Sequence, residues 1–395
     1  MALKDRDVVI CGYVRTAVGS FQGTLSPFSA SELGAMAVKE VITRSGVEPE
    51  CVDEVIMGCV LTGGQGQAPG RQAWIKAGFP AEVGAITINK VCGSGLKAVA
   101  LAAGLIRGGM GSLYVAGGQE SMTNAVYAIA KARAGLRMGN AEIEDLMVKD
   151  GLWDVYNQRH MGFLAENCAA KYGFTRQLQD EFAIRSYERA LAATAAGKFR
   201  TEIFPVEIPG KAGTALFTED EEPKKLRKEK VSTLKPSFRP DGTVTAVNAS
   251  SINDGAALLV VASAAKAAEL GMTPIARIIG YGQGGEAPEW FTIAPVKAIR
   301  RALDSAGLKK EEIDCWEINE AFSVVTLAAM QEYDLSPNAV NLFGGSCAIG
   351  HPIGASGARI LCTLLSVLKD QGKSIGLATL CIGGGEGNAM IVEMV

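Results

Sequence analysis

The first 120 residues alternate between short apolar runs and longer segments with helical spacing of their apolar positions. The runs that predict strands are residues 8–14, 55–60, 87–91 and 113–116, and the segments that predict helices are residues 30–45 and 96–106. Strands that alternate with helices are typical of an α/β fold, and they predict a largely parallel sheet covered by helices on both faces.

Residues 121–248 have a different character. They hold a charged tract at 218–230, several prolines and long polar stretches, with a helix expected near 177–196. We interpret this part as a region inserted into the fold. The alternation then resumes, with strands expected at 256–261, after Pro274, at 313–318, 375–380 and 389–395, and helices at 295–306 and 322–333.

The two ends of the chain resemble each other. In each, a predicted strand runs into a Cys-Gly type of turn, at Cys92 and at Cys381, and an apolar segment follows. This echo indicates an internal duplication of low sequence identity.

Composition narrows the class of protein. The 395 residues suggest two or three domain-sized units, and 48% hydrophobic residues are enough for a substantial core. A net charge of −3 argues against a general nucleic-acid binder. Residues 256–265 form the best apolar stretch, half of the roughly 20 residues that a membrane span needs. The charged N-terminus also lacks the apolar core of a signal peptide, so we expect a cytoplasmic protein that binds neither nucleic acid nor membrane.

Cysteine and histidine usage argues against a metal site. The nine cysteines are odd in number and form no C-x-x-C pair, so neither a disulfide framework nor a zinc ribbon is indicated. The two histidines are His160 and His351, which nearly excludes a multi-histidine metal centre. Any mechanism that needs an imidazole must choose between these two positions.

Cys92 is a candidate nucleophile. It lies at the expected start of a helix after what we take for a buried strand, where the helix dipole favours the thiolate. Its glycine neighbours, Gly93 and Gly95, would let a ligand approach and leave backbone N–H groups free for an oxyanion. The local pattern fits a small buried cysteine in a tight turn equally well.

His351 is the better of the two histidines for activating a thiol or polarising a carbonyl. It lies in the glycine-rich segment 344–357, and we expect it to be displayed on a loop and not packed on an apolar face. A purely structural histidine is the alternative. His160 precedes Met161 and is expected to be a binding or surface residue.

Two further positions are ambiguous on local sequence. Cys381, before the glycine run 383–385, would serve as an acid or base if its pKa lay near the working pH, but an ordinary buried cysteine is the more common case. The glycine run lacks the Lys-Ser/Thr of a phosphate-binding P-loop. Asn319 would hold a water or orient an imidazole, or it would simply cap a helix.

Taken together, these segments resemble the thiolases, the coenzyme A-dependent acyltransferases that make or cleave 3-ketoacyl-CoA. The resemblance covers essentially the whole chain and is densest at residues 89–95, 319–322, 350–357 and 381–385, with further matches at 15–21, 160–162, 165–167, 248–250 and 253–255. The chain looks closest to the short-chain, acetoacetyl-CoA type.

The resemblance implies the thiolase fold, in which two similar βαβαβαββ halves stack as α-β-α-β-α layers and carry an inserted loop domain. It divides the chain into an N-terminal half (1–120 with 249–271), a loop domain for CoA binding and assembly (121–248) and a C-terminal half (272–395). It also implies a homotetramer, with residues 121–140 where tetrameric members have their assembly loop.

The resemblance also implies roles. Cys92 takes the acyl group as a thioester after His351 activates its thiol, and Cys381 moves the α-proton of the second acyl-CoA. One oxyanion site consists of His351 and a water held by Asn319, and another of the backbone N–H groups of Cys92 and Gly383. The substrates are acetyl-CoA, acetoacetyl-CoA and CoA, with no metal and no cofactor beyond CoA as a substrate, and the kinetics are ping-pong.

Substrate-binding positions follow in the same way. The resemblance places His160, Met161 and Ser250 around the pantetheine arm, and Ala321 and Phe322 also match the substrate site. Lys224 and Arg227 fall in the segment where the family binds the nucleotide end of CoA. A solvated charge run is the alternative for these two cations, because residues 218–222 beside them are acidic.

The chain departs from the family at positions that leave acyl-chain length open. Such departures are Leu342-Phe343, Ser346-Cys347 in place of Ala-Ile, Glu386, and Trp290-Phe291 where short-chain members often have Met-Gly. The alternatives are a thiolase for longer 3-ketoacyl chains, a ketoacyl synthase-like condensing enzyme, and a thiolase-fold subunit without catalysis. Retention of all four catalytic side chains argues against the last.

Overall fold

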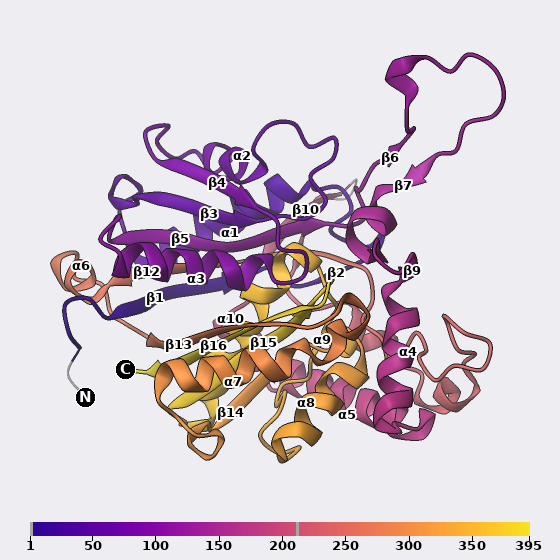
Figure 1. The fold of residues 1–395 in the computed structure, drawn as a ribbon. Helices are drawn as coiled ribbons and strands as arrows, with labels where there is room; N and C mark the ends of the chain where they lie inside the picture. Colours follow the sequence, from indigo (N-terminus) through magenta and orange to yellow (C-terminus); the bar gives the residue numbers. More distant parts are fainter. Residues whose placement is uncertain (1–2, 211–212) are drawn as a thin grey trace.

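A ten-stranded mixed sheet organises the computed structural model, which describes residues 3–210 and 213–395 (Figure 1). The strand order is β14-β15-β16-β13-β1-β12-β5-β3-β4, and the short β2 pairs with β12. The sheet consists of two halves, because β1 and β13 share only the pairs Val9–Arg277 and Ile10–Ala276.

The N-terminal half contains six strands and three of the larger helices. The strands are β1 (Val8–Arg15), β2 (Gly19–Ser20), β3 (Glu54–Gly58), β4 (Gly84–Ile88), β5 (Leu113–Ser121) and β12 (Asn253–Ser263), and the helices are α1 (Ala30–Ser45), α2 (Pro69–Lys76) and α3 (Ser94–Arg107). The short α6 (Ala264–Glu269) follows β12. The prediction for residues 30–45 is confirmed, because Ser29 and Glu32 form a capping box and Gly46 ends α1 in the left-handed conformation.

The C-terminal half contains four strands and four helices. They are β13 (Ala276–Gly285), α7 (Ala294–Ala306), β14 (Cys315–Ile318), α8 (Ser323–Tyr333), α9 (Ser346–Ile349), α10 (Ile353–Gln371), β15 (Ile375–Ile382) and β16 (Glu386–Met394). Helices α3 and α10 pack on each other between the two half-sheets, with α1 and α2 outside one half and α7 and α8 outside the other. This gives the five layers that the resemblance to the thiolases implies.

The expectation of a largely parallel sheet is wrong. The pairs β3–β4, β3–β5 and β14–β15 are parallel, but the pairs in the middle of the sheet are antiparallel. A continuous apolar run indicates that a strand is buried on both faces. Here the strands in the middle of the sheet are buried in this way although their neighbours are antiparallel.

The topology confirms an internal duplication, but the turns at Cys92 and Cys381 do not occupy equivalent positions in the two halves. The order β3-β5-β12-β1 repeats as β14-β15-β16-β13, with the same sequence of parallel and antiparallel pairs. Cys381 lies in β15, the counterpart of β5, whereas Cys92 follows β4. The matching helices are α3 and α10, so Cys92 and His351 are the residues in corresponding places.

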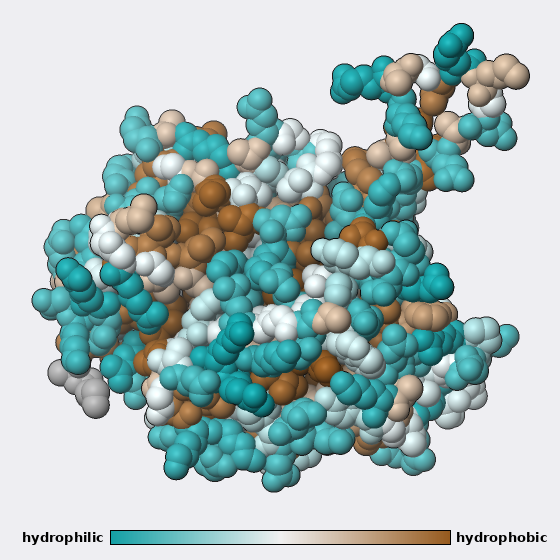
Figure 2. All heavy atoms as spheres, viewed as in Figure 1, coloured by the Kyte–Doolittle hydropathy of each residue, from teal (hydrophilic) through white to brown (hydrophobic). Residues whose placement is uncertain are grey.

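Residues 122–252 lie mostly outside the sheet. They form two helices, α4 (Met161–Tyr172) and α5 (Arg176–Ala195), and six short strands that pair as three antiparallel ladders. The ladders are β6 (Tyr127–Ala128) with β7 (Glu144–Asp145), β8 (Trp153–Asp154) with β9 (Arg159–His160), and β10 (Val206–Gly210) with β11 (Gly213–Phe217). We call residues 126–146, which carry β6 and β7, the arm. Figures 1 and 2 show the arm projecting from the body of the molecule.

Candidate active site

Cys92 lies on a strained turn between β4 and α3. Val91 before it has a φ of +45°, which is unfavourable for a β-branched residue. Ser94 stabilises the turn, because its Oγ accepts the Lys90 N–H at 2.8 Å and donates to the Val91 carbonyl at 2.7 Å. The strand before this turn, β4, is a partly exposed edge strand, so our expectation of a buried strand is wrong.

The N-terminal turns of α3 and α10 cross at two glycines. A Cβ on Gly95 would lie 2.7 Å from the Ala358 nitrogen, and one on Gly357 would lie 2.4 Å from the Leu96 nitrogen. Because neither position tolerates a side chain, the helices approach backbone to backbone. This contact brings Cys92 and His351, which precede the two helices, to the same cavity.

His351 is buried, at 5% exposure, and is not displayed as we expected. Glycines here serve close packing and not exposure, and the segment that we took for a loop continues into α10. The His351 N–H donates to Asn253 Oδ1 at 2.8 Å, and the ring Nδ1 lies 2.6 Å from Ser356 Oγ.

The tautomer of His351 follows from Ser356. The Ser356 hydroxyl has one hydrogen, which it donates to the Pro352 carbonyl at 2.8 Å, so it accepts from Nδ1–H of the ring. The other nitrogen, Nε2, therefore carries the lone pair, and it has no hydrogen-bond partner in the described part of the chain. It is free to accept a proton, and His351 lines the same cavity as Cys92 and Cys381.

Burial makes the three titrating groups neutral. It raises the pKa of Cys92 to about 12, although the backbone N–H groups of Gly383 and Cys92 oppose it. Burial, together with the nearby Cys92 thiol, raises the pKa of Cys381 well above its usual range. Burial and the cation of Arg359 lower the pKa of His351 to about 3. The thiolate that we expected from the helix dipole is therefore not the resting form, because desolvation outweighs the dipole.

These groups meet in one cavity of about 300 Å³. Of the predicted site residues, Cys92, His160, Met161, Ser250, Ala321, Phe322, His351, Cys381 and Gly383 line it. The lining residues that we did not select are Met122, Gly151, Leu152, Phe238, Ala249, Ser251, Ile252, Phe291 and Ile353. Most of these are apolar, and four of the nine (Met122, Gly151, Leu152 and Phe238) come from the inserted region, so their residue types carry no chemical signal in the sequence. Phe291 is one of the departures from the family pattern.

A tight glycine turn places Gly383 beside Cys92. Gly384 and Gly385 have φ values of +89° and +88°, and a Cβ on Gly385 would lie 2.4 Å from the Glu286 carbonyl oxygen. The glycine run thus forms the sharp connection between β15 and β16. With this turn in place, the Gly383 N–H points to the Cys92 thiol.

His160 and Phe238 form one wall of the cavity. His160 caps α4, and its Nδ1 accepts the Gly162 N–H at 3.1 Å, so the hydrogen of the neutral ring is on Nε2. The ring stacks on Phe238 with 4.8 Å between centroids. Burial lowers the pKa of His160, which keeps the ring neutral.

Three predicted site residues lie outside the cavity lining. Asn319 is fully buried behind it, directly after β14. Lys224 forms an exposed ion pair with Glu219 at 2.5 Å, and the guanidinium of Arg227 donates to the carbonyls of Lys224 and Leu226. The structure thus does not bring the two cations to the catalytic residues, and their contact with the nucleotide end of CoA stays a prediction.

Within residues 3–210 and 213–395, no cluster of three or more His, Cys, Asp or Glu side chains forms a metal site. Over the same residues, no helix is long and apolar enough to span a membrane.

Comparison with known proteins decides the family. A model of the thiolase N-terminal domain matches residues 8–265, and one of the thiolase C-terminal domain matches residues 272–394. The chain belongs to the thiolase family. An acetyl-CoA acetyltransferase of Cupriavidus necator is 54% identical, over 98% of this chain and 99% of that protein. A cytosolic acetyl-CoA acetyltransferase of Gibberella zeae is 50% identical, over 98% of each chain.

A solved structure agrees over the same length. A thiolase of Ascaris suum in complex with coenzyme A superposes with a TM-score of 0.93 at 42% identity, covering 98% of this chain and all of that one. The family resemblance and the fold expected from the sequence are thereby confirmed.

Proposed function

We propose that this thiolase is an acetyl-CoA C-acetyltransferase, which interconverts two acetyl-CoA with acetoacetyl-CoA and CoA. The observation that carries the proposal is the meeting of Cys92, His351 and Cys381 in one cavity beside the Gly383 backbone N–H. The full-length relatives of about 50% identity carry this activity in their names.

The first half-reaction follows from the neutral resting state. Nε2 of His351 accepts the proton of the Cys92 thiol as sulfur attacks the thioester carbonyl, so the two charges appear only during the reaction. The N–H groups of Cys92 and Gly383 then donate to the oxygen that becomes negative. Departure of CoA, reprotonated by His351, leaves acetyl-Cys92.

Cys381 is the group we assign to the second half-reaction. The Cys381 thiol first gives its proton to Nε2 of His351. The resulting Cys381 thiolate removes the α-proton of a second acetyl-CoA, and the carbon attacks acetyl-Cys92, whose sulfur leaves as a thiolate and takes up the proton held by His351. The bond to Cys92 sulfur breaks and acetoacetyl-CoA forms; in thiolysis, the Cys381 thiol returns the proton. The raised pKa of Cys381 makes its thiolate strongly basic, which suits it to a weakly acidic carbon.

Aromatic side chains support the preference for a short acyl group. Phe322 lies edge-on to both Phe238 and Phe291, with centroids 6.1 and 6.2 Å away. All three line the cavity, and their bulk favours a short acyl group over a long one.

Assembly, location and domain division belong to the same proposal. Exposed apolar side chains on the arm support a homotetramer, because Met138 is 99% and Tyr127 65% exposed in the single chain. The relative named as cytosolic supports a cytoplasmic location. We also retain the division into 1–120 with 249–271, 121–248 and 272–395, with CoA entering along the middle part.

Thiolysis of acetoacetyl-CoA by free CoA tests the function, followed as loss of the enolate absorbance. We expect rapid loss with the unmodified protein and none with Cys92→Ser. A matched reaction with a longer 3-ketoacyl-CoA should be at least about tenfold slower in kcat/KM. Preference for the longer substrate would replace the acetyl assignment, and inertness toward both would refute thiolase activity.

A further inference from the structure

The orientation of the Asn319 side-chain amide determines whether its free end donates or accepts a hydrogen bond. Its oxygen would accept a hydrogen bond, and its nitrogen would donate one. A water that uses its hydrogens toward an oxyanion has lone pairs left to accept from the amide behind it, so the nitrogen must be the free end. The two ends look alike in shape, and only their hydrogen-bond partners determine which way the amide points.

A charged side chain behind Asn319 fixes that orientation. Arg359 Nη2 lies 2.6 Å from Ser346 Oγ, and Ser346 Oγ lies 2.6 Å from Asn319 Oδ1. Arginine can only donate, so Ser346 accepts from it and must use its single hydrogen toward the amide. The amide end that faces Ser346 is therefore oxygen, and Nδ2 is left without a partner in the described residues.

The contacts between Arg359, Ser346 and Asn319 are shielded from solvent. Ser346 and Asn319 are 0% exposed and Arg359 is 1% exposed, so solvent does not replace a lost contact. The three side chains come from α9, from the end of β14 and from α10. Their contacts thus tie three elements of the C-terminal half together at the back of the cavity.

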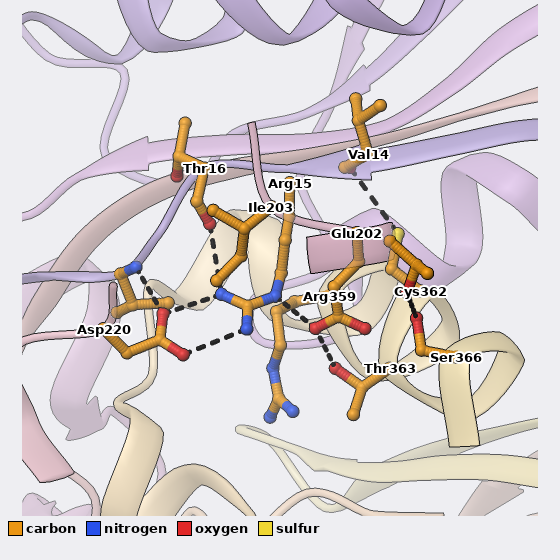
Figure 3. A network of polar contacts seen from close by, with 12 residues as sticks. Val14, Arg15, Thr16, Glu202, Ile203, Asp220, Arg359, Cys362, Thr363 and Ser366 are labelled. Carbon is orange, nitrogen blue, oxygen red and sulfur yellow. Dashed lines mark hydrogen bonds and ion pairs between the residues drawn. The ribbon is translucent and has the colours of Figure 1, made fainter. Parts of the chain in front are cut away.

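Neighbouring carboxylates maintain the cation. Burial lowers the pKa of Arg359, and the charges of Glu317 and Glu202 oppose that effect. Figure 3 shows Arg359 next to the buried network in which Arg15 bonds Glu202 at 2.6 Å and Asp220 at 2.7 Å. A guanidinium remains protonated in such a setting, so Arg359 always acts as the donor to Ser346.

We propose that Ser346 and Arg359 are positioning residues for catalysis, which hold the Asn319 amide with Nδ2 free to donate to the water of the oxyanion site that Asn319 shares with His351. The inference rests on the proposed thiolase function. Neither residue touches substrate; both act through Asn319. Ser346 is one of the departures from the family pattern, so this chain adds a fixed hydroxyl where an alanine is more usual.

Steady-state thiolysis of acetoacetyl-CoA tests the proposal with Ser346→Ala and Ser346→Thr. Losing the orienting hydroxyl should lower kcat roughly tenfold, less than the 10²–10³ typical of deleting a donor itself, with KM within about twofold. Ser346→Thr keeps the hydroxyl and should recover most of kcat. Ser366→Ala is the control, because that buried serine on α10 bonds Thr201 and Tyr13 instead.

A double-mutant cycle separates positioning from general loss of stability. In an Asn319→Ala background, Ser346→Ala should change kcat by less than about twofold, because the group it orients is gone. A full tenfold loss in that background, or equal kcat for Ser346→Ala and Ser366→Ala, would overturn the proposal. Turnover by the unmodified protein, measured first, decides the proposed function independently.

Discussion

At the scale of single residues, the candidate site consists of neutral groups whose charges appear only during turnover. Cys92 and Cys381 are protonated at neutral pH, and His351 is an uncharged imidazole with its lone pair on Nε2. The enzyme thereby avoids a buried resting charge, which would be costly without a partner. Reactivity comes from the proximity of base and thiol and from N–H donors aimed at the developing oxyanion.

His351 should make the fold sensitive to acid. Its pKa is about 3 in the folded chain against 6.5 in the unfolded one, so its contribution to stability is present above pH 6.5 and is lost as the pH falls toward 3. Between pH 7 and pH 5 this costs about 2 kcal/mol in the free energy of unfolding. His351→Gln should lose less stability than the unmodified protein over that range, measured by urea unfolding at both pH values. Parallel losses in the two proteins would contradict a buried, neutral His351.

At the scale of elements, sequence patterns located most helices and strands but not the direction of the strands. Residues 30–45 formed α1 as predicted because caps mark both its ends. Strand direction depends on connections and on which half-sheet a strand joins, which apolar periodicity does not encode. The glycines in residues 344–357 predict a loop, because the sequence alone does not show that Gly357 packs against α3.

The sequence likewise marks some residues of the candidate active site and not others. Cys92, His351 and Cys381 could be selected because their residue types carry chemistry and their segments resemble the thiolases. Phe238 and Leu152 could not, because an apolar wall residue looks like any core residue until the inserted region folds over the cavity.

One ion pair connects the two turns that carry the cysteines. Lys90, on the turn before α3, contacts both carboxylate oxygens of Glu386 at 2.8 and 2.7 Å, at the start of β16. Glu386 is 46% exposed, so the pair adds at most about 1 kcal/mol to stability. Its position suggests a second effect, on the alignment of the Cys92 and Cys381 segments.

Lys90→Glu should therefore lower kcat, by roughly fivefold for a misalignment worth about 1 kcal/mol. The charge-swapped pair, with Lys90→Glu and Glu386→Lys together, should recover at least half of the lost activity. Lys198→Glu is the matched control, because Lys198 and Asp370 form a partly exposed pair on the body of the protein. Equal kcat for Lys90→Glu and Lys198→Glu, or no recovery of activity in the charge-swapped protein, would show that the Lys90–Glu386 pair does not align the cysteine segments.

At the scale of the whole molecule, the arm exposes large apolar side chains to solvent in the single chain. Its base is the two-residue ladder of β6 and β7, and beyond it Leu136 and Ile143 are 58% and 66% exposed. Apolar side chains on a projecting hairpin are costly in water, and they gain free energy when a second copy covers them. Figure 2 shows how far the arm stands from the body of the molecule.

Charged substitutions on the arm should therefore break the proposed tetramer. Leu136→Asp with Met138→Asp should convert a tetramer into a dimer, measured by light scattering on a sizing column, without changing the melting temperature of the body. Met110→Asp is the control, because Met110 is 71% exposed away from the arm. A dimeric unmodified protein, or a doubly substituted protein that stays tetrameric, would remove the arm from assembly.

The two cysteines are proposed to have different tasks, and the mass of the intact protein after incubation with acetyl-CoA distinguishes them. The unmodified protein and Cys381→Ala should each gain one acetyl group, located on Cys92 by peptide mapping, while Cys92→Ser gains none. Cys381→Ala should then fail to form acetoacetyl-CoA from that acetylated state. Acetylation that persists in Cys92→Ser, or that disappears in Cys381→Ala, would contradict the account.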